Sequence, residues 1–324
     1  MDFSITLSNV LVTLMYILPG FIVCKLKRAA VDHLSTLSGV LVYGCAPCMV
    51  ISSFLKLKFS IDDLINMGWF FLVTFVLQAA FMGLIYGLLH KKMKDARYRV
   101  LTIGSVLGNV GFFGLPVVKA LLPGNDEVMC YSAVYVITMN ILVFTVGVFC
   151  LTGDKRYMTL KAAILNPSMF GFVTGLLLYV LRVGEGIAYL SKAEGVAEIV
   201  RSLPQLAQTS LDLLGNMTTP LCMIILGVRL ATVSFKRLFS RPTVYLVCLG
   251  KLVLFPLFCY AAVYFLPLDH AFKASVLILS ATPCASVVFN LAEMHKSEAE
   301  LSANCVLLST LLCFLTIPVL TLLL

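Results

Sequence analysis

Ten runs of about twenty mostly apolar residues recur along this 324-residue chain, and they limit what it can fold into. An α-helix needs about 20 apolar residues to cross the hydrocarbon core of a bilayer. The chain is 60% hydrophobic and 12% charged, whereas a soluble domain is about 45–50% apolar and about 25% charged. The sequence therefore predicts an all-α integral membrane protein with ten transmembrane helices, at residues 6–24, 34–55, 64–89, 98–121, 128–151, 159–181, 207–231, 242–265, 271–294 and 301–323.

The basic residues predict how these helices are oriented. The connections after runs 1, 3, 5, 7 and 9 hold 16 of the 24 Lys and Arg residues, and those after runs 2, 4, 6 and 8 hold seven. Because Lys and Arg concentrate in cytoplasmic connections, we expect both termini outside the cell and a multi-pass protein of the plasma membrane. Lys251 lies within run 8, where we expect it to pack or to reach the interface. No basic segment precedes the first run, which favours a first helix over a cleaved signal peptide.

Two pairs of prolines predict an internal repeat. Five helices is an odd number, so a second half of five enters the membrane with opposite polarity and the repeat is inverted. Pro47 in run 2 and Pro220 in run 7 are 173 residues apart, and Pro116 in run 4 and Pro283 in run 9 are 167 apart. We expect Pro47 and Pro220 to take part in binding the substrate. The predicted divisions are the first repeat at 1–151, the start of the second repeat with an extracellular connection at 152–206, and the remainder of the second repeat at 207–324.

The segment 108–116, GNVGFFGLP, places three glycines, an asparagine and a proline inside run 4. Proline interrupts a helix, and irregular backbone at membrane depth is tolerated only where protein buries it or where it lines a wet cavity. Each proline alone is also compatible with a simple kink, but matched breaks in two halves indicate a transporter's binding site. Free amides at the start of a half-helix favour an anion such as a carboxylate. We expect Asn109, Gly111 and Pro116 to bind substrate, together with Pro283 and Ser286 of run 9.

Polar residues inside runs 5 and 7 are candidates for a supporting role. A carboxylate within a membrane span is costly, so Asp212 near the start of run 7 is a candidate for binding a coupling proton or sodium ion. The alternative is that the helix begins later and Asp212 caps its N-terminus. Asn216 and Thr219 follow in a polar patch that we expect to face the break, with Thr219 binding substrate and Asn216 in a supporting role. Asn140 in run 5 either bonds to a neighbouring helix or supports the break.

The cysteines and histidines give no sign of a metal centre. Eleven cysteines are spread over the chain, mostly within apolar runs, where Cys behaves as a small hydrophobic residue. Cys45 and Cys48 are the closest pair, and no other Cys or His with ligand spacing accompanies them. We expect no catalytic residue, no metal and no cofactor, and the question of a disulfide stays open.

The motif GNVGFFGLPVV in run 4 resembles the signature of the auxin efflux carrier family, which includes the plant PIN-FORMED proteins. Four other segments resemble that family's patterns, and together they extend the resemblance over nearly the whole chain. They are Asn166-Pro167 at the start of run 6, NILVFTVG at 140–147, TPLCMIILG at 219–227 and ATPCAS at 281–286.

The resemblance implies a ten-helix fold of two inverted five-helix repeats in which helices 4 and 9 are broken and cross. Helices 1, 2, 6 and 7 would form a scaffold, and helices 3–5 and 8–10 a mobile transport domain. Asn109 would contact substrate at the crossing. Family members often carry an asparagine just after the proline of helix 9, where this chain has Ser286 as the nearest polar residue. The long cytoplasmic loop of many plant members is absent, which indicates a compact carrier of the bacterial type.

These observations favour a secondary transporter that exports small organic anions, such as carboxylates or auxin-like acids, by alternating access. The alternative is a sodium- or proton-coupled symporter of the bile-acid type. An intramembrane enzyme would need a nucleophile–base pair or paired carboxylates at membrane depth, and the sequence shows none. The expected partners are the anion, the lipid bilayer, a coupling H⁺ or Na⁺ if transport is coupled, and a second copy bound through the scaffold helices. No nucleic acid is expected.

Overall fold

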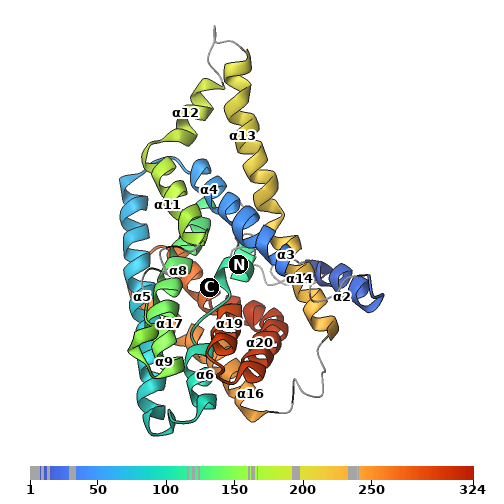
Figure 1. Cartoon of the computed structure of the whole chain (residues 1–324). Coiled ribbons are helices and arrows are strands. Elements are labelled where there is room, and N and C mark those ends of the chain that lie inside the picture. Colours follow the sequence, from blue (N-terminus) through green and yellow to red (C-terminus); the bar gives the residue numbers. More distant parts are fainter. Residues whose placement is uncertain are drawn as a thin grey trace.

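The computed structural model describes residues 8, 11–12, 15–28, 34–114, 117–118, 121–122, 125–159, 161, 165, 167–191, 198–232, 239 and 241–324. Within this part of the chain every regular element is a helix. The one pairing of extended backbone recorded there is an isolated antiparallel bridge between Gly108 and Cys284. The all-helical architecture that the apolar runs predict is therefore observed (Figure 1).

The first half of the chain contains short helices as well as one long one. Its α-helices are α2 (Ile17–Lys25), α3 (Leu34–Gly39), α4 (Ala46–Lys56), α5 (Ile61–Leu89), α6 (Ala96–Gly104), α8 (Asp126–Leu142) and α9 (Val148–Thr152). Wider π-helical turns interrupt them at η2 (Val40–Cys45), η4 (Val110–Gly114) and η5 (Val143–Gly147). Two 3₁₀ turns, η3 (His90–Lys92) and η6 (Lys155–Tyr157), lie in basic connections.

The second half follows a similar plan. Its helices are α11 (Pro167–Val180), α12 (Val183–Leu190), α13 (Glu198–Asn216), α14 (Thr218–Thr232), α16 (Pro242–Leu249), α17 (Phe255–Tyr264), α18 (His270–Ser280), α19 (Ser286–Met294) and α20 (Ala299–Leu320). A π-helical turn, η7 (Gly250–Leu254), joins α16 to α17, and a 3₁₀ turn, η8 (Thr321–Leu323), follows α20.

Six helices among the described residues are long and apolar enough to cross a membrane. They correspond to runs 2, 3, 5, 7, 8 and 10, and a seventh crossing is made by α11 and α12 if this bent pair, with its angle of 60°, is one span. Runs 4 and 9 are broken by the irregular segments between α6 and η4 and between α18 and α19. The chain is a multi-pass membrane protein, but the continuous helices alone do not confirm ten spans or an inverted repeat.

The charged connection expected at 182–206 is largely helical. The helix α12 begins at Val183, and α13 begins at Glu198 and continues without a break to Asn216. In Figure 1, α12 and the first part of α13 project beyond the other helices. Of the charged residues in this segment, Glu185 lies on α12 and Glu198 lies on α13. Asp212 is therefore in the last turns of a long helix, and the alternative that it caps an N-terminus is wrong.

Prolines explain three of the irregular turns. A proline cannot donate to the carbonyl four residues earlier, and its ring pushes that carbonyl away. Pro47 follows the turn η2, Pro220 follows the break between α13 and α14, and Pro256 follows the turn η7. In each case the residue four positions earlier lies in the turn or at the break, so the missing hydrogen bond and the widened backbone coincide.

The helices pack in two groups. The first group is made by α2 against α14 and by α4 against α11 and α13. The second group is made by α5 and α18 against α8, by α6 against α9 and α16, and by α20 against α16 and α19. The irregular turn η4 contacts α14, and α4 contacts α8, so the interrupted part of run 4 lies where the two groups meet. On α5, exposed Ile65, Trp69, Leu72 and Val76 recur at helical spacing and form a face suited to lipid.

Candidate functional site

The breaks in runs 4 and 9 lie side by side and are hydrogen-bonded to each other. The backbone N–H of Asn109 donates to the carbonyl of Pro283 over 2.7 Å, and the N–H of Ala285 donates to the carbonyl of Leu107 over 2.9 Å. Extended backbone replaces helix here, so these bonds satisfy groups that would otherwise be unpaired in the membrane. The hydroxyl of Ser309 on α20 accepts a further bond from the N–H of Cys284 over 3.0 Å.

The crossing is closely packed around Gly108. A Cβ atom on this glycine would overlap the hydroxyl of Thr282 and would lie 3.0 Å from the Nζ atom of Lys251. No other residue type leaves room for this approach. Gly108, the first residue of the GNVGFFGLP motif, is therefore the glycine of this motif with the least space around it.

A cavity of about 160 Å³ opens beside the crossing, where the two groups of helices face each other. The second group supplies Asn109, Ser286 and Asn290, with Thr310 of α20. The first group supplies Ser38 of α3 and Arg229 of α14 as polar residues, and several apolar residues complete the lining. Asn109 and Ser286, which the sequence predicts at one site, thus line the same cavity.

Arg229 is the charged residue among those that line this cavity. It is half-buried in the last turn of α14, and among the described residues no carboxylate forms an ion pair with it. A guanidinium group in this position is suited to binding a carboxylate through two hydrogen bonds. Arg229 is not among the site residues predicted from the sequence, because the count of basic residues assigned it to the connection after run 7. The signal was available, since residue 229 lies inside the predicted span 207–231.

Asn290 is a second lining residue that was not predicted from the sequence. It supplies an amide side chain on helix α19, which begins at Ser286. Ser286 begins α19, and Asn290 follows four residues later, on the same face of that helix. The amide side chain expected just after Pro283 is therefore provided one turn further along the chain. Helical spacing from Ser286 was the signal that would have found it.

Several other predicted site residues that the structure describes are not part of the lining of this cavity. Gly111 is in η4, where a Cβ atom would meet Val136 of α8 at an ordinary 3.7 Å. Pro47 is buried where a Cβ on Gly171 of α11 would contact it, and Pro220 and Thr219 are half-buried near the start of α14, outside the cavity lining. Two further residues are Asn140, which is buried in α8, and Pro116, which lies outside the described residues.

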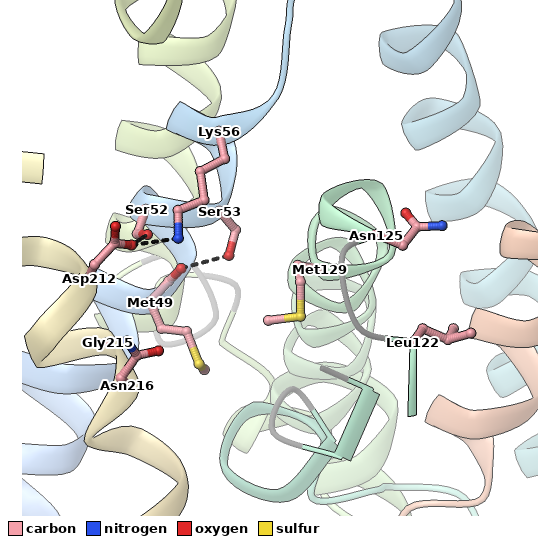
Figure 2. Close-up of a pocket in the computed structure, with 10 residues that line it drawn as sticks. All are labelled: Met49, Ser52, Ser53, Lys56, Leu122, Asn125, Met129, Asp212, Gly215 and Asn216. Carbon is pink, nitrogen blue, oxygen red and sulfur yellow. Dashed lines mark hydrogen bonds and ion pairs between the residues drawn. The ribbon is translucent and has the colours of Figure 1, made fainter. Parts of the chain in front are cut away.

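Asp212 and Asn216 line a second, smaller cavity of about 60 Å³ between α4, α13 and α8 (Figure 2). The carboxylate of Asp212 forms an ion pair with Lys56 of α4 over 2.7 Å and accepts a hydrogen bond from Ser52. Figure 2 shows these side chains together on one side of the cavity and Met129 of α8 on the other. The ion pair links two helices of the first group, and Asn125 adds a polar group near α8.

A third cavity, of about 470 Å³, adjoins the one at the crossing. The two share Ser38 and Arg229 as polar lining residues, and the larger one extends toward Leu34 and Thr232. These two residues adjoin the basic connections after runs 1 and 7. The cavity at the crossing therefore continues toward the side of the molecule on which the basic connections lie, and Arg229 stands where the two cavities join.

Comparison with known proteins identifies the family. The model of the family described as membrane transport protein matches residues 5–321. The chain belongs to this family. It is the auxin efflux carrier family that the GNVGFFGLP motif indicates, and the membership agrees with a function in transport rather than catalysis.

Two archaeal proteins are similar to the chain over almost its full length. An uncharacterized transporter of Methanothermobacter thermautotrophicus is 25% identical over 324 residues and covers 98% of both chains. An uncharacterized transporter of Methanocaldococcus jannaschii is 22% identical over 320 residues and covers 97% of both chains. These matches therefore extend over the parts of the chain that contain both breaks.

Proposed function

We propose that this protein is a secondary carrier that exports small organic anions, and that the cavity at the crossing is its substrate site. The observation that carries the proposal is the set of donors around that cavity. Asn109 and Asn290 offer amide groups, Ser286 a hydroxyl, and Arg229 a guanidinium group. The set is rich in donors and contains one positive charge, which suits a carboxylate better than a cation or an apolar solute.

The size of the cavity limits the substrate to a compact molecule. A protein cavity of roughly 150 Å³ holds benzene, and the cavity at the crossing measures about 160 Å³. A short or single-ring carboxylate fits such a space. The adjoining larger cavity supplies a path by which the anion reaches the crossing from the side of the basic connections, which we assign to the cytoplasm.

Alternating access follows if the two groups of helices move relative to each other. We assign helices 1, 2, 6 and 7 to the scaffold and helices 3–5 and 8–10 to the transport domain, in two inverted repeats. This division is supported by the two packing groups, between which the substrate cavity lies. Movement of the second group would carry Asn109 and Ser286 along the first group toward Asp212 and Asn216 of α13. Exposed apolar residues on α11 and α13 of the scaffold offer a face for a homodimer.

The membrane potential is sufficient to drive export. Moving one charge through 100 mV is worth about 2.3 kcal/mol, and an inside-negative potential favours exit of an anion. Asp212 remains the candidate for a coupling ion, although its ion pair with Lys56 gives it a structural role as well. A plasma membrane location, with both termini outside, completes the proposal.

Thermal-shift measurements on the purified protein test the substrate class. Benzoate, acetate and indole-3-acetate are compared with the matched neutral amides and with sodium, each over a range of concentrations. A bound ligand raises the unfolding free energy by RT ln(1 + [L]/Kd). We expect the carboxylates to raise the melting temperature and the neutral amides to leave it unchanged. Equal shifts with amides, or shifts with cations alone, would contradict the proposal.

Counterflow in proteoliposomes separates uniport from coupled transport. Vesicles loaded with an unlabelled carboxylate take up the labelled form, with and without sodium and with and without a pH gradient. Uptake that is independent of both ions supports a uniporter. A strict requirement for sodium or for a proton gradient would instead favour the symporter.

A further inference from the structure

Lys251 is a completely buried lysine that the substrate cavity does not contact. It lies in η7, in the middle of the span Pro242–Tyr264, and its exposed fraction is 0%. Lysines near the ends of a span reach the membrane interface through their flexible side chains. Lys251 instead packs in the interior of the second group of helices, so an anchoring role at the interface does not account for it.

The ammonium group of Lys251 is directed at the broken part of run 9. Its Nζ atom donates to the carbonyl of Ser280 over 2.5 Å and lies 4.7 Å from the ring centroid of Phe255. Ser280 is the last residue of α18. The carbonyls at the end of a helix are unpaired and carry the negative end of the helix dipole. Lys251 therefore caps α18 at the crossing.

These contacts leave the positive charge without a matching negative one. Among the described residues no carboxylate forms an ion pair with Lys251. The titratable groups that interact with it electrostatically are the thiols of Cys259 and Cys284. An ammonium group has three donors and is costly to bury without a partner anion. A carbonyl and an aromatic ring offset this cost only in part.

The ammonium group of Lys251 and the substrate cavity lie on either side of the backbone at Gly108 and Asn109. A Cβ atom built on Gly108 would be 3.0 Å from the Nζ atom, and the next residue, Asn109, lines the cavity. One extended strand of backbone thus separates the ammonium group from an anion held by Asn109. At this depth in the membrane such a charge acts on the anion with little screening.

We propose that Lys251 is the internal counter-charge of the transported anion. The inference rests on the proposed function, because it requires an anion at the crossing. The lysine belongs to the same packing group as Asn109 and Ser286 and would move with them. A monoanion and Lys251 together carry no net charge, so the loaded transport domain crosses the field without doing electrical work. The empty domain returns with its positive charge toward the negative interior, and the potential drives that step.

Exchange measurements on the wild-type protein test this assignment. Exchange of labelled for unlabelled benzoate across a proteoliposome uses only the loaded domain, whereas net efflux also needs the empty return. We expect the exchange rate to be unchanged by an imposed potential of about 100 mV and the net efflux rate to rise with it. Exchange that accelerates with potential would overturn the proposal.

A binding experiment gives a second, independent result. We expect Lys251→Met to lower benzoate affinity by about tenfold or more and Lys251→Arg to retain most of it. Lys273→Met is the matched control, since Lys273 is a partly exposed lysine of α18 that bonds the carbonyl of Tyr264. Met is apolar and similar in length, so Lys251→Met is expected to keep the wild-type melting temperature or raise it. Unchanged benzoate affinity in Lys251→Met would contradict the assignment, whereas a wild-type protein that binds no carboxylate would contradict the proposed function itself.

Discussion

At the crossing, the space for an added side-chain atom is smallest at Gly108. Gly108→Ala places a methyl group against Thr282 and Lys251, so we expect the free energy of unfolding to fall by about 1–3 kcal/mol and anion binding to be lost. Gly111→Ala is the control within the same motif, because its methyl group meets Val136 at van der Waals distance. Melting temperatures and benzoate titrations of the two variants measure the difference. Equal effects would mean that the motif requires its glycines for another reason.

Arg229 is expected to contribute more to anion binding than any neutral side chain in the cavity. A hydrogen bond to a charged group is worth about 1.5–3 kcal/mol and a neutral one about 0.5–1.5. We therefore predict a loss of tenfold or more in affinity for Arg229→Gln and a several-fold loss for Asn109→Ala, with about the wild-type melting temperature in both.

Arg97→Gln is the control for these two variants, since Arg97 is exposed and pairs with Asp95 in a basic connection. Isothermal titration with benzoate reports the three affinities. If Arg229→Gln bound benzoate as the wild type does, Arg229 would have to be removed from the site.

Among the elements, the pair α2 and α14 depends on contact between backbones. A Cβ atom on Gly20 would overlap the carbonyl of Ile224, and one on Gly227 would overlap the carbonyl of Ile17. Small residues permit such approach between membrane helices. We predict that Gly227→Ala lowers the melting temperature by several degrees. Gly39→Ala, in α3 with no atom within 4 Å of the added carbon, should leave it unchanged or slightly higher.

The link between α4 and α13 is electrostatic. The ion pair of Asp212 and Lys56 is 2.7 Å long, and the side chains are 29% and 37% exposed, so solvent weakens it. A double-mutant cycle with Asp212→Asn and Lys56→Met should give a coupling free energy of about 0.5–1 kcal/mol that decreases with added salt. A coupling of zero would show that the pair holds the helices no better than its neutral replacements. The same Asp212→Asn variant, measured in counterflow with and without sodium, shows whether the carboxylate also binds a coupling ion.

For the whole molecule, the predicted topology places the basic connections on the cytoplasmic side. A phosphatase fused after Leu324 should be active, because the C-terminus is expected outside, and a phosphatase inserted in the basic connection at Lys94 should be inactive. A fluorescent protein, which matures in the cytoplasm, gives the complementary pattern at the same two positions. The reverse pattern would place the large cavity near Arg229 on the outside and reverse the transport direction inferred from it.

The sequence alone was enough to predict that this protein lies in a membrane, that it is helical and that runs 4 and 9 are interrupted. Runs of about twenty apolar residues favour helices, because a helix satisfies its own backbone hydrogen bonds in a bilayer. Pro47, Pro256 and Pro283 lie at or directly after interruptions of these helices. The GNVGFFGLP motif was enough to indicate the family to which the chain belongs. These properties depend on amino-acid composition and on the spacing of residues within one segment. Both can be read directly from a sequence.

The packing of the helices in three dimensions sets which side chains share a cavity. It joined Asn109 to Ser286 across more than 170 residues, added Arg229 and Asn290, and kept Gly111 and the prolines of runs 2 and 7 out of the lining. It also extended α13 into a charged segment that resembles a loop, and it placed Lys251 behind Gly108. The reason is that helix periodicity tells which residues share a face, whereas the crossing turns two faces toward each other through long-range backbone bonds that no local pattern encodes.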